Sequence, residues 1–221
     1  MAQIRMNPAF SALMVQILAK VTSFAKFSFI IGSKMAFFAP AAMLLPLAGA
    51  FGGIAGSLGM LGMGLAIRCV FFGAMPLAFF AFHIPGFFAS LYWASTSKLI
   101  RIAPALVCAL LFMVHPIGAA NLWYSLFWIV PVVAALLPSR LFTTALGSSF
   151  TAHAVGTLVW LYAGQLSSAD FAVLAPVVIV ERLMMAVGMV LAYKVIAHVY
   201  STLRQAQGER GKISFCALTT K

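Results

Sequence analysis

The stretch "VVIVERLMMAVG", residues 177–188, places Glu181 and Arg182 in the middle of a long apolar run. A helix that begins near residue 171 rises about 1.5 Å per residue, which puts Glu181 roughly 15 Å deep in a hydrocarbon core about 30 Å thick. Charges at that depth are costly unless they are paired or face a polar cavity, so by default they mark functional positions. The stretch therefore predicts a membrane-spanning helix and, within it, the polar centre of a helical bundle.

Composition indicates the same environment. Of the 221 residues, 64% are hydrophobic and 8% are charged, and the mean hydropathy is +1.08. A water-soluble domain normally carries charge on about a quarter of its residues, so a chain this apolar requires lipid as its solvent. We predict a single transmembrane domain over 1–203 and a disordered cytoplasmic tail over 204–221, where the composition becomes polar.

The charge pattern predicts the orientation. The chain has 14 Lys and Arg against 3 Asp and Glu, a net charge of +11. The basic residues lie mostly between apolar runs, as Lys98 and Arg101 do, and at both ends, where Arg5 and Lys20 belong to the N-terminal group. Cytoplasmic loops under the positive-inside rule have this pattern, which makes nucleic acid a poor explanation for the charge. We therefore expect a multi-pass protein of the plasma (inner) membrane, with both termini in the cytoplasm.

Apolar segments at helical length recur along the chain. We predict an all-α, polytopic bundle of about six transmembrane helices, with the clearest spans at 103–114, 122–137, 142–163 and 171–200. The Gly-, Pro- and Ala-rich zone 35–82 predicts short or re-entrant pieces, with breaks near Pro40, Pro46, Gly52 and Gly53. The first segment, 1–33, is either an amphipathic interfacial helix or a first span whose polar face packs against protein.

The segment before the last span supplies a second deep polar residue, His153. Polar and aromatic residues recur there at three- and four-residue steps and form one stripe: Ser149, His153, Gly156, Thr157 and Trp160. His153 lies at the depth of Glu181 on an antiparallel neighbour, so we expect Glu181 to face the interior near His153, where the two bind a ligand or relay a proton. The alternative is a small-residue packing seam with His153 hydrogen-bonded across it.

Arg182 and three glycines are predicted to serve structure or coupling. Adjacent helix residues point about 100° apart, so we expect Arg182 to reach a different neighbour from Glu181, as an interhelical ion pair or clamp. Gly52, Gly53 and Gly56 belong to a four-residue glycine spacing that is typical of a close helix-packing face.

Three further residues are ligand-binding candidates. Trp160 closes the polar and aromatic stripe, and Asn121 lies at the outer end of a span, where it could cap a pocket open to the outside. His83 precedes Pro85, and a proline-broken helix exposes carbonyls that are tolerated at membrane depth only inside protein or beside a cavity. For the neighbouring aromatic residues we favour an interfacial belt, which comprises Tyr92, Trp93, Trp123, Tyr124 and Trp128.

Motifs for enzymes and cofactors are missing from the sequence. It contains no G-x-x-x-x-G-K nucleotide loop, no H-E-x-x-H metal motif and no C-x-x-C pair. We therefore predict no catalytic residue, no metal ligand and no cofactor.

In its layout the chain resembles the substrate-binding S components of energy-coupling-factor transporters. The stretch "LLPLAGAFGGIAGSLGMLGMG", residues 44–64, is similar to the Pro- and Gly-rich segment that follows the first helices of that family. The resemblance implies a small basic membrane protein of six helices with cytoplasmic ends. It also implies partners, namely a transmembrane coupling subunit and ATPases encoded elsewhere.

These observations favour a membrane transport component that binds and imports a small molecule, such as a vitamin or a nucleobase-like compound. A planar, mostly uncharged molecule suits candidate residues of the Trp, Tyr, His and Asn types. Two alternatives remain, an intramembrane enzyme that uses His153 and Glu181, and a structural or assembly membrane protein.

Overall fold

A computed structural model describes residues 4–23, 41–73 and 77–219, and within these ranges the regular secondary structure is entirely helical. The predicted all-α class is therefore confirmed. The helices are α1 (Pro8–Thr22), α2 (Ala41–Leu44), α3 (Leu47–Phe72), α4 (Leu77–Ala94), α5 (Lys98–Val114), α6 (Pro116–Ala119), the 3₁₀ helix η1 (Leu122–Trp128), α7 (Ile129–Leu136), α8 (Leu141–Tyr162) and α9 (Ser168–Thr219).

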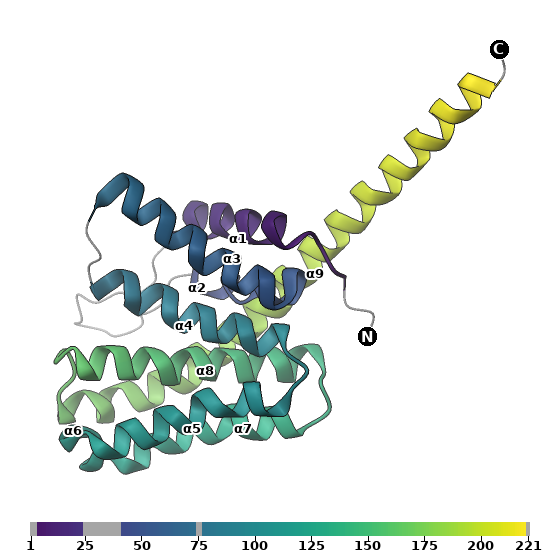
Figure 1. Cartoon of the computed structure of the whole chain (residues 1–221). Helices are drawn as coiled ribbons and strands as arrows, with labels where there is room; N and C mark the ends of the chain where they lie inside the picture. The colour runs from purple at the N-terminus through teal and green to yellow at the C-terminus, as the bar shows by residue number, and fades with distance from the viewer. Residues whose placement is uncertain (1–3, 24–40, 74–76, 220–221) are drawn as a thin grey trace.

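The helices stack side by side, and from α3 onward the long ones alternate in direction (Figure 1). α1 packs on α3, α3 on α4, and α4 on α8, which in turn contacts α5, α7 and α9. α1 begins, and α9 leaves the bundle, at the same end (Figure 1). α8 therefore lies at the centre, which places its polar residues inside the protein.

The predicted spans of the second half all form helices. Residues 103–114 lie in α5, residues 142–162 in α8 and residues 171–200 in α9, whereas 122–137 is divided between η1 and α7. In the part of the chain that the structure describes, two helical segments, Leu47–Phe71 and Ser168–Ala206, are long and apolar enough to cross a membrane. Pro8–Thr22 and Leu122–Leu136 are shorter apolar helices. The number of crossings stays a prediction.

The inner face of α1 carries Ser11 and Gln16 together with small apolar residues such as Ala12 and Val15, and its larger apolar residues face outward. Ser11 Oγ donates to the Ala48 carbonyl (3.1 Å) and Gln16 Nε2 donates to the Met60 carbonyl (2.8 Å), both on α3. Phe10, Leu13 and Ile17 are exposed on the opposite face. Of the two sequence alternatives for this segment, this arrangement favours the span whose polar face packs against protein.

The predicted breaks in the glycine-rich zone occur at Pro46 and Gly53. Pro46 caps α3 and separates it from the single turn of α2, and Gly53 interrupts α3 with φ +64° and ψ −156°. That backbone region favours glycine because a Cβ would be strained there. Pro40, the other predicted break, lies outside the described residues.

The glycine spacing only partly forms the predicted packing face. A Cβ on Gly52 would lie 3.1–3.2 Å from Ser11 and Pro8, so this position does let α1 approach α3. A Cβ added to Gly53 would meet nothing within 4 Å, so Gly53 does not form the predicted packing contact. Its positive φ instead produces the kink in α3. A Cβ added to Gly56 would approach the carbonyl of Ala48, which also belongs to α3. The kink between the two residues brings these turns of the same helix close together.

Two apolar cores fill the molecule, and α9 belongs to both. The first core joins α1, α2 and α3 to the later part of α9, from Met185 onward. The second core joins α5, η1 and α8 to the early part of α9, from Phe171 to Val178. Glu181 and Arg182 therefore lie where α9 passes from one core to the other.

Arg101 ties three segments together at the end of the bundle where α5 begins. Its Nε donates to the carbonyls of Tyr92 (3.0 Å) and Ser95 (2.8 Å), and its Nη1 donates to Ser139 Oγ (2.9 Å). The guanidinium also lies 5.2 Å from the centre of the Tyr92 ring. The sequence placed Arg101 among loop charges, but the side chain is buried as a clamp on the last carbonyls of α4.

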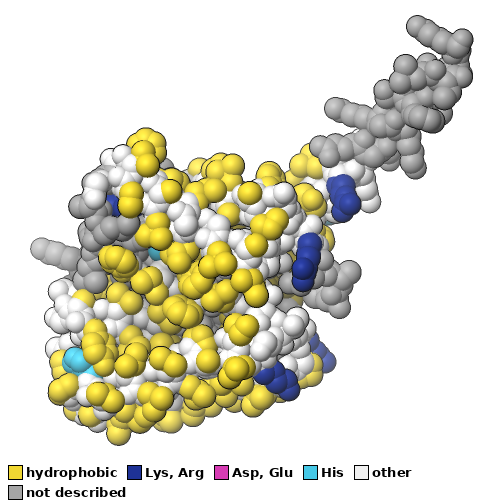
Figure 2. Space-filling model, in the orientation of Figure 1, with side chains coloured by type: hydrophobic (Ala, Val, Ile, Leu, Met, Phe, Trp, Pro, Cys, Tyr) yellow, Lys and Arg dark blue, Asp and Glu magenta, His cyan; other side chains and the backbone are white. Residues whose placement is uncertain are grey.

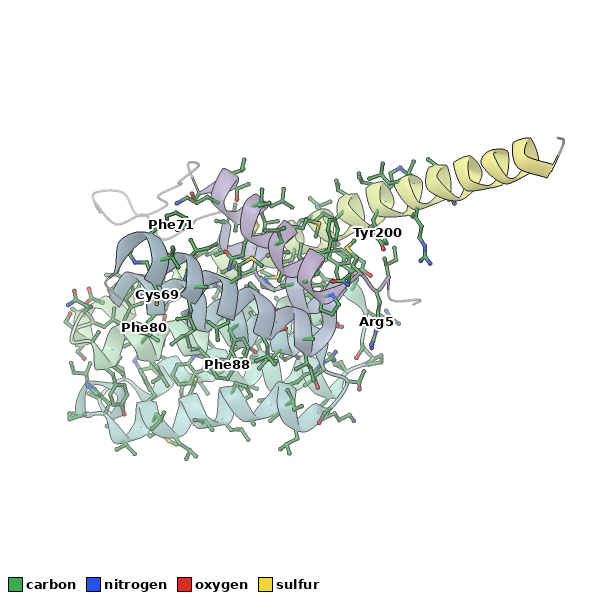
Figure 3. The ribbon with its side chains drawn as sticks, turned by 45° about the horizontal axis from the view of Figure 1, so that its top comes forward. Arg5, Cys69, Phe71, Phe80, Phe88 and Tyr200 are labelled. Carbon is green, nitrogen blue, oxygen red and sulfur yellow. The ribbon has the colours of Figure 1, made fainter. Side chains whose placement is uncertain are left out.

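Exposed basic residues gather mainly at one end of the bundle. Figure 2 shows Lys and Arg side chains along the edge from which α9 departs, next to a largely hydrophobic face. Arg5 and Tyr200 mark this end in Figure 3, and Phe71 and Phe80 mark the other. Lys20, which the sequence grouped with Arg5, lies in the last turn of α1 and so at the opposite end of that helix.

The C-terminal residues differ from the prediction of a disordered tail. α9 continues to Thr219 and projects away from the other helices (Figure 1). Extending an existing helix avoids the cost of nucleation, and Leu203, Arg204 and Ala206 at the start of this part are good helix formers.

The α3–α4 contact generates a stability prediction. A Cβ on Gly49 would lie 2.0 Å from the Ser90 carbonyl, whereas one on Gly62, also in α3, would meet nothing within 4 Å. We expect Gly49→Ala to lower the free energy of unfolding by about 1–3 kcal/mol, and Gly62→Ala to leave it unchanged or raise it by up to about 1 kcal/mol. Denaturation of the purified variants in detergent measures both, and equal stability of the two would contradict the close approach of α4.

Candidate functional site

α9 begins at a well-formed cap, which fixes the depth of its charged residues. Asp170 Oδ2 accepts hydrogen bonds from the Ser167 backbone N–H and from Ser167 Oγ, both at 2.7 Å. Ser167 and Asp170 therefore form the N-terminal cap of α9. Glu181 follows Asp170 by eleven residues, or roughly 16 Å along the helix axis.

Glu181 and Arg182 form an ion pair with each other. Arg182 Nη2 lies 2.7 Å from Glu181 Oε1, and only 12% of the Arg182 side chain and 7% of the Glu181 side chain are exposed. The expectation that the two would reach different neighbours is wrong, because the long arginine side chain spans the 100° between adjacent positions. The contact lacks hydrogen-bond alignment, so Glu181 Oε1 has no hydrogen-bond partner despite the ion pair.

His153 lies on α8 close to this pair. Its Nε2 is buried without a hydrogen-bond partner, and the imidazole is within electrostatic range of Arg182. No hydrogen bond joins His153 to Glu181 among the described residues, and the predicted proximity of the two side chains stays a prediction. Arg182 thus lies close to both residues, because it is ion-paired with Glu181 and within electrostatic range of His153.

Tyr124 is a member of the site that the sequence assigned to an interfacial belt. Its ring centre lies 5.6 Å from that of His153, and its hydroxyl is within electrostatic range of both Arg182 and Glu181. The same hydroxyl faces Thr157 on α8 without a well-aligned hydrogen bond. The signal that could have found it is the three-residue repeat of η1, which turns both Asn121 and Tyr124 into the protein.

The polar stripe of α8 divides between two neighbours. Ser149 Oγ donates to the Arg182 carbonyl (3.2 Å), which ties α8 to α9 beside the ion pair. His153 and Thr157 continue this side toward Tyr124. Gly156 instead faces Pro85 of α4, where an added Cβ would lie 3.6 Å from the proline ring.

We call Glu181, Arg182, His153, Tyr124 and Thr157 the central cluster. Arg182 Nε, like His153 Nε2, is buried without a hydrogen-bond partner. Aromatic rings of the second core surround the cluster, with Phe127 and Phe150 at 6.3 and 6.4 Å from the His153 ring and Phe171 at 4.7 Å from that of Tyr124. Unsatisfied polar atoms in such surroundings are costly, which makes the cluster the strongest candidate for a ligand site.

The other predicted ligand residues lie outside the cluster. Asn121 is buried, but its Nδ2 donates to the Ile117 carbonyl (2.8 Å) and to Ser168 Oγ (2.6 Å), so it joins η1 to the start of α9. His83 approaches Gly64 of α3, where an added Cβ would lie 2.8 Å from the ring. Trp160 is half-buried near the end of α8. The candidates therefore do not converge on one pocket.

The chemistry available to the cluster is hydrogen bonding and proton exchange. Within the described residues, no three His, Cys, Asp or Glu side chains gather to hold a metal ion. The cluster offers one carboxylate, one guanidinium, one imidazole and two hydroxyls.

Coupling between Glu181 and Arg182 generates a testable prediction. Removing one partner leaves a buried charge uncompensated, so Glu181→Leu and Arg182→Leu should each destabilise the protein by roughly 3–5 kcal/mol. The double replacement should cost less than either single one, because neither charge is left alone. Detergent unfolding of the three variants, with Thr151→Ala on another face of α8 as control, measures the coupling, and additive single effects would contradict the pair.

Comparison of the chain with protein-family models, with curated proteins and with solved structures gave no match.

Proposed function

We propose that this chain is an integral membrane component that imports a small molecule, and that the central cluster binds this molecule. The observation that carries the proposal is the buried Glu181–Arg182 pair beside His153, at the level where α9 passes between the two cores. Charged groups buried midway along apolar helices commonly line ion or substrate pathways.

The polarity of the helices supports a lipid surrounding. Large apolar side chains cover the outer faces, including Leu106 and Leu110 on α5 and Leu191 and Val195 on α9. The polar residues Ser11, Ser148 and Thr151 are fully buried. This arrangement is unfavourable in water and favourable in hydrocarbon.

The distribution of charge supports a cytoplasmic location for the end where α1 begins and α9 departs. Arg5, Lys98, Arg140, Lys194 and Arg204 are exposed, and by chain direction all belong to this end. Under the positive-inside rule, both termini then face the cytoplasm of a cell bounded by a plasma (inner) membrane.

Uptake driven by ATP requires a nucleotide-binding subunit. The chain contains no nucleotide-binding loop of the G-x-x-x-x-G-K type. We therefore include in the proposal a transmembrane coupling subunit and ATPases as partners, in line with the family resemblance drawn from the sequence.

The proposed orientation predicts which residues an impermeant thiol reagent reaches in intact cells. In a cysteine-free background, Ala120→Cys should be labelled from outside, because it follows α6 at the end opposite the basic residues. Ser97→Cys, exposed at the basic end, is the matched control and should be labelled only after the membrane is opened. The reverse pattern, or equal labelling of both, would contradict the orientation.

The proposed function predicts that a small molecule remains bound during purification. Native mass spectrometry of the full chain should detect it on the wild type and on Thr151→Ala, a buried change on another face of α8. His153→Ala should reduce its occupancy by about tenfold, because one lost buried hydrogen bond is worth about 1–3 kcal/mol. A stoichiometric protein partner with no bound small molecule would instead indicate an assembly factor, and equal occupancy in all three would place the site elsewhere.

A further inference from the structure

We propose that the central cluster selects a flat ligand of zero net charge that presents a hydrogen-bond donor and an acceptor side by side, as a lactam, an imide or a cyclic urea does. This inference rests on the proposed function and names the ligand class of the same site. Three observations on the cluster carry it, namely its charge balance, its free hydrogen-bonding atoms and its aromatic surroundings.

The charges of the cluster cancel locally. Glu181 and Arg182 are 2.7 Å apart, and they are the only charged residues of α9 between Asp170 and Lys194. Those two neighbours lie roughly 16 and 18 Å away along the helix axis. A net charge on the ligand would therefore enter an apolar surrounding without a counter-charge, which is strongly unfavourable.

The free atoms call for both kinds of hydrogen-bonding group. Arg182 Nε is a donor only and needs an acceptor, whereas Glu181 Oε1 is an acceptor only and can take a donor in addition to its ion pair with Arg182 Nη2. Both groups lie on adjacent residues, so one edge of a small molecule can meet both. His153 Nε2 adds a third position that either donates or accepts, according to the tautomer.

The rings around the cluster favour a planar molecule. Tyr124, Phe127 and Phe150 lie with their centres 5.6–6.4 Å from that of His153. Aromatic side chains with a few convergent polar groups are typical of sites for small planar ligands.

Three matched probes test the inference on the full chain in lipid nanodiscs. Uracil is flat and neutral with adjacent donors and acceptors, orotate adds a carboxylate to the same ring, and dimethyluracil, methylated on both ring nitrogens, lacks the donors. We expect uracil to raise the unfolding temperature and to bind at least about tenfold more tightly than either analogue. Orotate binding as tightly as uracil would overturn the charge argument, and equal binding of dimethyluracil would overturn the donor–acceptor argument.

Glu181→Gln tests the charge argument in the opposite direction. This variant keeps the size and polarity of the side chain but leaves the Arg182 charge uncompensated. The preference should then shift toward orotate, whereas Thr151→Ala should keep the preference for uracil. An unchanged preference in Glu181→Gln would overturn the role of the ion pair.

Identifying the molecule that stays bound to the purified protein distinguishes failure of this inference from failure of the proposed function. A retained molecule that is neutral at physiological pH and lost in His153→Ala supports the ligand class even where uracil does not bind. A retained molecule that carries a net charge overturns the ligand class and leaves the proposed function intact. The absence of any retained molecule, together with no binding of the three probes, overturns both.

Discussion

The helices of this protein have apolar outer faces, and their inner polar groups must therefore be satisfied within the bundle. Side chains meet this requirement largely by donating to carbonyls of a neighbouring helix. Ser11 bonds to Ala48 across α1 and α3, Ser148 to Ala89 across α8 and α4, and Tyr92 to Pro131 across α4 and α7. Each of these hydrogen bonds fixes the axial position of one helix relative to the next, because a shift by one turn would leave both groups unpaired at a high cost in apolar surroundings. The positions of these serine and tyrosine side chains therefore determine the register of the bundle, while the apolar residues determine only which faces turn outward.

α9 connects the parts that this network holds separately. Its early residues pack with the second core, and its residues from Met185 onward pack with the first core. Glu181 and Arg182 occupy the intervening turn, and the hydrogen bond from Ser149 to the Arg182 carbonyl ties that turn to α8. A polar turn between two apolar cores has fewer apolar contacts than its flanks, so it is the part of α9 that can accommodate a ligand with the least loss of core packing. The location of the ion pair in this turn therefore supports its proposed role in ligand binding.

The sequence predicted the helices of the second half and the breaks at Pro46 and Gly53, because apolar runs, basic boundaries and Pro or Gly act locally. It also identified Glu181, Arg182 and His153, whose polar atoms are buried midway along α9 and α8, since position along a helix follows from the helical rise alone. It did not predict how they pair, because reasoning from Cα directions ignores the reach of an arginine side chain. Tyr124 and Arg101 were misassigned for a related reason. Each lies near the end of an apolar run, where a belt or loop residue is expected, and only the packing of non-adjacent segments turns it inward.

The two buried arginines show how a structural role differs from the role proposed for the cluster. Arg101 directs Nε at two carbonyls and Nη1 at a serine, and it covers the Tyr92 ring, so its polar atoms are matched by acceptors at the end of the bundle. Arg182 has a single close partner, the adjacent carboxylate, and its Nε has none. A buried charge adds stability only when hydrogen bonds offset the cost of removing it from water, and Arg101 has such hydrogen bonds whereas Arg182 Nε has none. The incomplete hydrogen bonding of Arg182, next to the equally unpartnered Nε2 of His153, is therefore better explained by a ligand that completes it than by a contribution to the stability of the fold.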